Sequence, residues 1–233
     1  MAYVLGISWG VLTLIIMLLS DKYYVPRLLK RKSSDTDLTE AEEDNLSRHS
    51  KKTIRIVAIC SSVFAAISGF CLASLGHDMR VVSGFVALTI VNGVLSCIFI
   101  TDMQLKIIPN LCSIILLASK VVTSIIDFIQ DREFFVSFLI QCVLAGIGCL
   151  IFFLIISKVT QGGIGMGDVK ILSSIGFLCG IKVVLYSTFF SFVAASLFSL
   201  FLVLAKKKKV KDSLPFGPML WVGFEITALL CLV

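Results

Sequence analysis

Repeated runs of about twenty apolar residues limit the folds open to this chain more than any other feature. An α-helix needs roughly 20 residues to cross the bilayer's apolar core, which is about 30 Å thick. Seven runs come close to this length: residues 2–20, 56–75, 81–101, 107–126, 134–157, 183–205 and 214–233. A shorter apolar stretch, residues 168–180, adds an eighth candidate. We therefore expect an all-α membrane protein, a polytopic bundle of about eight transmembrane helices.

The composition excludes the main alternatives. Apolar residues make up 58% of the 233 residues and charged residues only 15%, against roughly 25% charged in ordinary soluble domains. A soluble globule could not bury that much apolar surface, and disordered chains are poor in such residues. The eight cysteines lie in or beside apolar runs without any C-x-x-C pair. This pattern favours cysteine as a small apolar residue and gives no support to a metal site.

Basic residues indicate how the helices are oriented, because cytoplasmic loops are enriched in Lys and Arg. With eight spans, the basic loop 21–55, Lys106, Lys158 and the cluster Lys206–Lys209 all fall on one side. We expect that side to be cytoplasmic and both termini to face away from it. The predicted organisation is a first helix in residues 1–20, a charged cytoplasmic loop in 21–55, and a membrane-embedded core in 56–233. The charges are thus explained by a cell membrane protein that contacts lipid, without a nucleic-acid partner.

Two aspartates stand at membrane boundaries on this predicted cytoplasmic side. Asp102 ends the third apolar run, and Asp168 opens the short sixth stretch. A carboxylate at such a place is unfavourable unless it is hydrated, paired with another polar group or required for function. Two nearby carboxyls cannot both ionise easily, so one can take a proton from water while the other donates to a carbonyl oxygen. The pair therefore suits peptide hydrolysis without a metal or other cofactor.

The segments around the two aspartates resemble those of a known family. Gly165-Met166-Gly167-Asp168 matches the GxGD signature of membrane aspartyl peptidases. Asp102 followed by Ile108-Pro109-Asn110, and the later Pro215-Phe216-Gly217-Pro218, are similar to elements of the type IV prepilin peptidase family. The order and spacing of all three agree with that family over roughly residues 56–233.

The resemblance implies a GxGD-type aspartic endopeptidase. Its substrate would be a prepilin or pilin-like protein, whose basic leader is cut at the cytoplasmic membrane face. Asp102 and Asp168 would be the catalytic pair. Substrate-binding or loop-shaping roles would fall to Gly165, Gly167, Lys170, Pro109, Asn110, Pro215, Phe216, Gly217 and Pro218. Longer members carry a two-C-x-x-C cytoplasmic domain linked to N-methylation. Loop 21–55 contains no cysteine, so we expect the short form without methyltransferase activity.

The acidic residues fit two other classes of membrane protein less well. A presenilin-like protease would need an aspartate in the fifth run, which has none. An ion- or proton-coupled transporter would place its acids near the bilayer midplane, whereas these two lie at one edge. Lys120 and Glu225 do lie inside apolar runs, and the sequence allows them to pair with each other or to face other groups.

Overall fold

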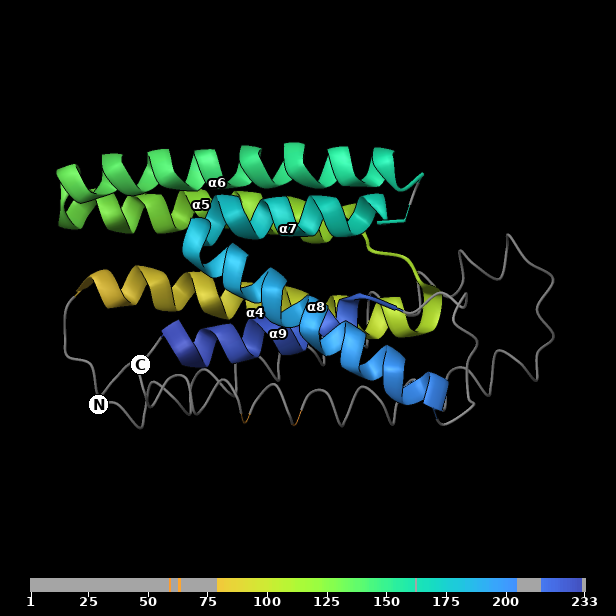
Figure 1. Ribbon diagram of the computed structural model, residues 1–233. Coiled ribbons are helices and arrows are strands. Elements are labelled where there is room, and N and C mark those ends of the chain that lie inside the picture. Colours follow the sequence, from red (N-terminus) through yellow and green to blue (C-terminus); the bar gives the residue numbers. More distant parts are fainter. Residues whose placement is uncertain (1–58, 60–62, 64–78, 162, 205–214, 232–233) are drawn as a thin grey trace.

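The computed structural model describes residues 59, 63, 79–161, 163–204 and 215–231 of the chain. Six helices follow one another there (Figure 1). Their bounds are α4 Met79–Leu105, α5 Asn110–Gln130, α6 Arg132–Val159, α7 Met166–Cys179, α8 Ile181–Leu204 and α9 Gly217–Cys231. The expected spans 2–20 and 56–75 and the charged loop 21–55 lie outside the described residues, apart from two isolated positions.

These helices confirm the all-α class, and each of them follows one of the expected apolar runs. α4, α5, α6 and α8 are long and apolar enough to cross a membrane, by length and composition. α9 is a shorter apolar helix, and α7 has only 14 residues. The third run continues as a helix to Leu105, so Asp102 lies within the last turn of α4 instead of after it. In the fourth run, proline delays the helix: Pro109 is the N-cap and Asn110 the first helical residue.

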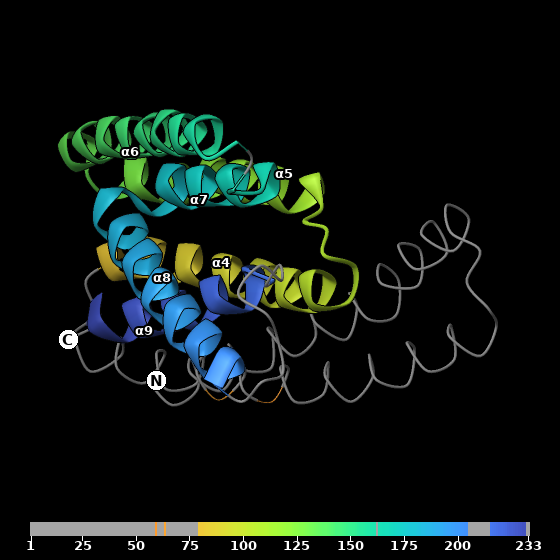
Figure 2. The ribbon, with the colours of Figure 1, turned by 45° about the vertical axis from the view of Figure 1, so that its right-hand side comes forward.

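Successive helices run in opposite directions through the bundle (Figure 2). The end of α4, the start of α5, the end of α6 and the start of α7 therefore meet at one end, which we call the site end. The end of α8 and the start of α9 lie at the same end (Figure 1). Asp102 and Asp168 both belong to it, as the sequence predicted from topology alone.

Small residues bring neighbouring helices close together. A Cβ at Gly176 of α7 would lie 3.2 Å from the carbonyl oxygen of Ala145 in α6, and a Cβ at Gly223 of α9 would collide with Ser191 of α8. Close backbone approach at small residues is the usual packing mode inside membranes. Behind these contacts, Val91, Leu95 and Ile98 of α4 are buried against the apolar faces of α7 and α9.

α7 and α8 are separated by a sharp turn at Gly180. Its φ of 84° lies in a region that residues with a Cβ rarely adopt. In Figure 1, α7 stops well short of the far ends of α5 and α6, and α8 leaves at a steep angle. The turn therefore lies inside the bundle instead of beyond it.

Candidate active site

Asp102 is held by the first residue of α9. Its side chain is buried, and Oδ2 accepts a hydrogen bond of 2.7 Å from the backbone N–H of Gly217. The amide of Phe216 also interacts with this carboxylate. The first N–H groups of a helix have no partner within the helix, and a carboxylate is favourable there. Asp102 thus caps α9, and α9 in turn fixes the carboxylate.

Glycine at position 217 allows this approach. A Cβ there would lie 3.0 Å from Asp102 Oδ2, 3.0 Å from Asp102 Cβ and 3.0 Å from Ile98 Cγ2. Those distances are shorter than ordinary carbon contacts. Pro218 follows in the first helical turn, where the missing N–H of proline is harmless. Pro215 and Phe216 precede the helix, and the ring of Phe216 packs on Phe192 of α8 with centroids 5.5 Å apart.

Asp168 is the third residue of α7, and Gly165 is the N-cap. The carboxylate lies close to the start of the helix: a Cβ at Gly165 would be only 3.0 Å from Asp168 Oδ2. Asp168 Oδ1 is buried and has no hydrogen-bond partner within the described part of the chain. Asp102 and Asp168 are close enough for their charges to interact. The fold therefore brings together two residues that lie 66 positions apart in the sequence (168 − 102).

The segment after α4 connects the two aspartates. Lys106 has a φ of 52° and donates its N–H to the carbonyl of Asp102 at 3.0 Å, which ends α4 in a left-handed C-terminal turn. A Cβ at Gly167 would lie only 2.8 Å from Ile108 Cβ. The start of α7 therefore packs directly on the loop that follows Asp102.

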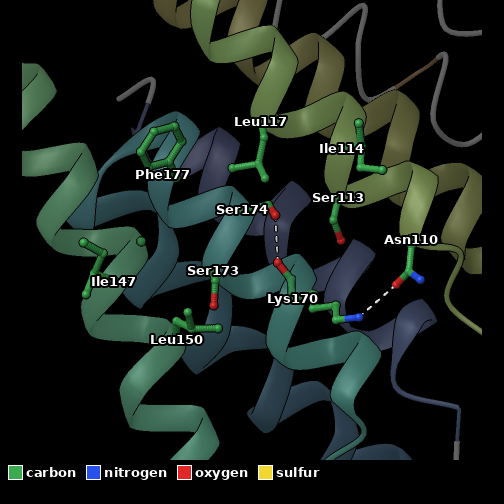
Figure 3. Close-up of a pocket in the computed structure, with 11 residues that line it drawn as sticks. Asn110, Ser113, Ile114, Leu117, Ile147, Leu150, Lys170, Ser173, Ser174 and Phe177 are labelled. Atoms are coloured by element: carbon green, nitrogen blue, oxygen red, sulfur yellow. Dashed lines mark hydrogen bonds between the residues drawn. The ribbon is translucent and has the colours of Figure 1, made fainter.

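Asn110 and Lys170 lie on the other side of α7. Lys170 Nζ donates to Asn110 Oδ1 at 3.0 Å, and both residues line a cavity of about 370 Å³ between α5, α6 and α7 (Figure 3). Ser173, Ser174 and Phe177 continue this face of α7 at helical spacing. Neither aspartate lines the cavity. Asp168 instead shares the opposite, buried face of α7 with Leu172 and Ile175.

The polar groups inside the apolar helices, Glu225 and Lys120, contact side chains and carbonyl groups of neighbouring helices. Glu225 of α9 is buried and interacts with the side chain of Asn92 in α4, while its Oε1 has no hydrogen-bond partner within the described residues. Asn92 Oδ1 also accepts from Trp221 Nε1 at 3.2 Å and from Ser96 Oγ at 3.3 Å. Lys120 binds groups on α6 and α7 instead of Glu225. The polar residues of the third run, Asn92 and Ser96, were the available signal for this network.

Within the described ranges, no group of three or more His, Cys, Asp or Glu side chains is arranged to hold a metal ion.

Comparison with known proteins connects this geometry to a family. The type IV leader peptidase family matches residues 89–200, a segment that contains both aspartates. A prepilin leader peptidase/N-methyltransferase of Bacillus subtilis (strain 168) is 29% identical over 124 residues, which cover 53% of this chain and 47% of that protein. The match thus spans about half the length of that relative, and no solved structure matches the chain. Over residues 89–200, just under half of its length, the chain is similar to the type IV leader peptidase family.

Proposed function

We propose that this chain is a membrane aspartic endopeptidase that removes the basic leader peptide from prepilins or pilin-like proteins. The observation that carries the proposal is the location of Asp102 and Asp168 at the same end of the bundle, within the segment that matches a peptidase family. The name of the Bacillus subtilis relative supports the substrate class.

The environments of the two carboxyl groups suit different roles. Asp102 accepts a hydrogen bond from the backbone N–H of Gly217, and hydrogen bonds of this kind favour a charged carboxylate. Asp168 Oδ1 has no donor within the described residues, so this group is the better candidate for the protonated member. In this scheme Asp102 takes a proton from a water molecule that attacks the scissile carbonyl, and Asp168 donates its proton to the developing oxyanion. As the C–N bond breaks, Asp102 passes its proton to the leaving amine and Asp168 takes a proton from a hydroxyl group of the collapsing intermediate, so the dyad returns to its starting state.

The orientation of the site follows from charge. Lys106, Lys158 and Lys170 belong to the site end, which supports a cytoplasmic location for the dyad. Leader removal at that face would leave the substrate's apolar helix in the membrane. The relative's name also includes an N-methyltransferase. We propose peptidase activity alone for this chain, because loop 21–55 lacks the cysteine pairs that the sequence analysis associated with methylation.

The direct test is cleavage of a prepilin-type precursor by the full chain in membranes. Asp102→Asn and Asp168→Asn should each reduce cleavage by at least about a thousandfold while the protein still accumulates, because neither amide can take over the proton transfers. Asp131→Asn is the matched control, since Asp131 caps α6 at the opposite end of the bundle. Cleavage retained by either site variant would refute the role, and loss of proton-coupled solute uptake in vesicles would favour a transporter.

A further inference from the structure

The C-terminal end of α7 lies inside the bundle, and Leu178 there is buried. Fourteen residues at about 1.5 Å each give a helix of about 21 Å, shorter than the roughly 30 Å apolar layer. The last carbonyl groups of a helix have no partners within it, and an unpaired carbonyl inside a membrane is strongly unfavourable. The end of α7 therefore needs donors from other helices.

Lys120 supplies such a donor from the middle of α5. Its side chain is only 4% exposed, and Nζ donates to the carbonyl oxygen of Leu178 at 3.3 Å. Nζ also contacts Cys142 Sγ of α6 at 3.2 Å and lies 4.5 Å from the centroid of the Phe138 ring. A positive charge at a helix C-terminus is favourable because it faces the negative end of the helix dipole.

A counter-charge for Lys120 lies on the same helix. Asp127, seven residues further along α5, is 2% exposed, and Oδ1 has no hydrogen-bond partner within the described residues. Cys142 experiences the charges of both Lys120 and Asp127. Asp127, Thr123, Phe138 and Leu178 line a cavity of about 130 Å³, which has room for water molecules that would solvate this carboxylate.

α5 therefore holds α7 at two levels. Near the site end, Lys170 of α7 bonds to Asn110, the first residue of α5, in an exposed position. Twelve residues after the start of α7, the carbonyl oxygen of Leu178 accepts a hydrogen bond from the buried Lys120. Exposed polar pairs contribute little, whereas a buried bond to a charged group is expensive to lose. The buried contact is thus the stronger of the two.

We propose that Lys120 is a positioning residue for the peptidase reaction. By capping α7 from within the membrane, it fixes the position of α7 along its axis and its rotation about that axis. These two quantities determine where Asp168 lies relative to Asp102. The short helix moves as a rigid rod, so a shift at Leu178 is transmitted to its first turn. This inference rests on the proposed function for its effect on cleavage. The cap itself can be tested without any substrate.

The experiment uses the full chain in lipid nanodiscs and two readouts: backbone hydrogen exchange of α7, and steady-state cleavage of a prepilin-type precursor. Lys120→Met should increase exchange over residues 172–179 about tenfold and lower kcat about tenfold, because the carbonyl loses its charged donor. KM should stay the same, since Lys120 does not contact the substrate. Lys120→Arg, which retains charge and donors, should restore both readouts to within about threefold of the wild type.

Lys182→Met is the matched control, because Lys182 is an exposed lysine two residues beyond the turn at Gly180. It should leave both readouts at wild-type values. If Lys120→Met does not accumulate, Lys120→Gln keeps a neutral donor and should give intermediate exchange. Exchange in Lys120→Met or Lys120→Gln that equals that of Lys182→Met would overturn the proposal. A wild-type chain that cleaves no precursor would count against the proposed function alone, and exchange would still decide whether Lys120 caps α7.

Discussion

The carboxylate of Asp102 accepts a hydrogen bond of 2.7 Å from the backbone N–H of Gly217, a residue 115 positions later in the sequence. This contact joins the end of α4 to the start of α9. It connects the first aspartate to the Pro215–Pro218 element, which lies outside the segment that matches the family. The two motifs therefore form one structural unit, and changes in one should affect the other.

Gly217→Ala tests that unit. The added Cβ would press on Asp102 and Ile98, so Asp102 must shift or α9 must retreat, at a cost of about 1–3 kcal/mol. We expect cleavage of a prepilin-type precursor to fall at least about tenfold. Gly148→Ala is the control, because a Cβ at Gly148 meets nothing within 4 Å. Equal activity of the two variants would show that the contact has no influence on the site.

Gly167→Ala should disturb the other half of the site. Its Cβ would lie 2.8 Å from Ile108 Cβ, which forces α7 away from the loop that follows Asp102. We expect a loss of activity about as large as that of Gly217→Ala. The double variant Gly167→Ala/Ile108→Gly removes the obstructing Ile108 Cβ with the atoms beyond it and should recover part of the loss. A double variant that is no better than the sum of its single changes would argue against this contact as the cause.

Lys106 occupies a left-handed backbone conformation, with a φ of 52°. Glycine adopts it without the strain of a Cβ, which is roughly 1–2 kcal/mol for other residues. The free energy of unfolding of Lys106→Gly should therefore exceed that of Lys106→Ala by about 1 kcal/mol. Both variants remove the charge near Asp102, so their difference isolates the backbone. Denaturant titration in detergent measures it, and equal stability would contradict the assigned turn.

The buried network of Asn92, Trp221 and Glu225 should stabilise the α4–α9 contact. Asn92→Leu removes the contacts of Asn92 with Glu225 and Trp221, and an unsatisfied buried group such as the Glu225 carboxyl costs about 1–3 kcal/mol. Asn92→Leu/Glu225→Leu, which removes both polar groups, should destabilise the protein less than Asn92→Leu alone. Thermal unfolding in detergent gives the comparison. Additive losses in the double variant would mean that the two side chains do not depend on each other.

Much of this architecture could be predicted from the sequence, because apolar length and proline positions are local signals. The runs around residues 134–157 and 183–205 became α6 and α8, and Pro109 set the start of α5. Asp102 and Asp168 were placed at one end by counting spans. That count requires only that successive helices alternate in direction.

The partners of Lys120 and Glu225 could not be predicted, since contacts between helices depend on how each helix is rotated about its axis. Lys120 meets the end of α7 only because α7 stops inside the bundle, which its apolar content does not reveal. The separation of Lys170 from Asp168 was within reach of the sequence. Two residues of helical spacing place their side chains about 200° apart, on nearly opposite faces.

Cysteine cross-linking measures the meeting of the two aspartates most directly. In an otherwise cysteine-free chain in membranes, Asp102→Cys/Asp168→Cys should form a disulfide, or a bridge with a short dithiol reagent, in most molecules. Asp102→Cys/Asp131→Cys should not, because Asp131 lies at the far end of the bundle. The opposite pattern, or no bridge between positions 102 and 168 when both thiols react with small reagents, would contradict a shared active site.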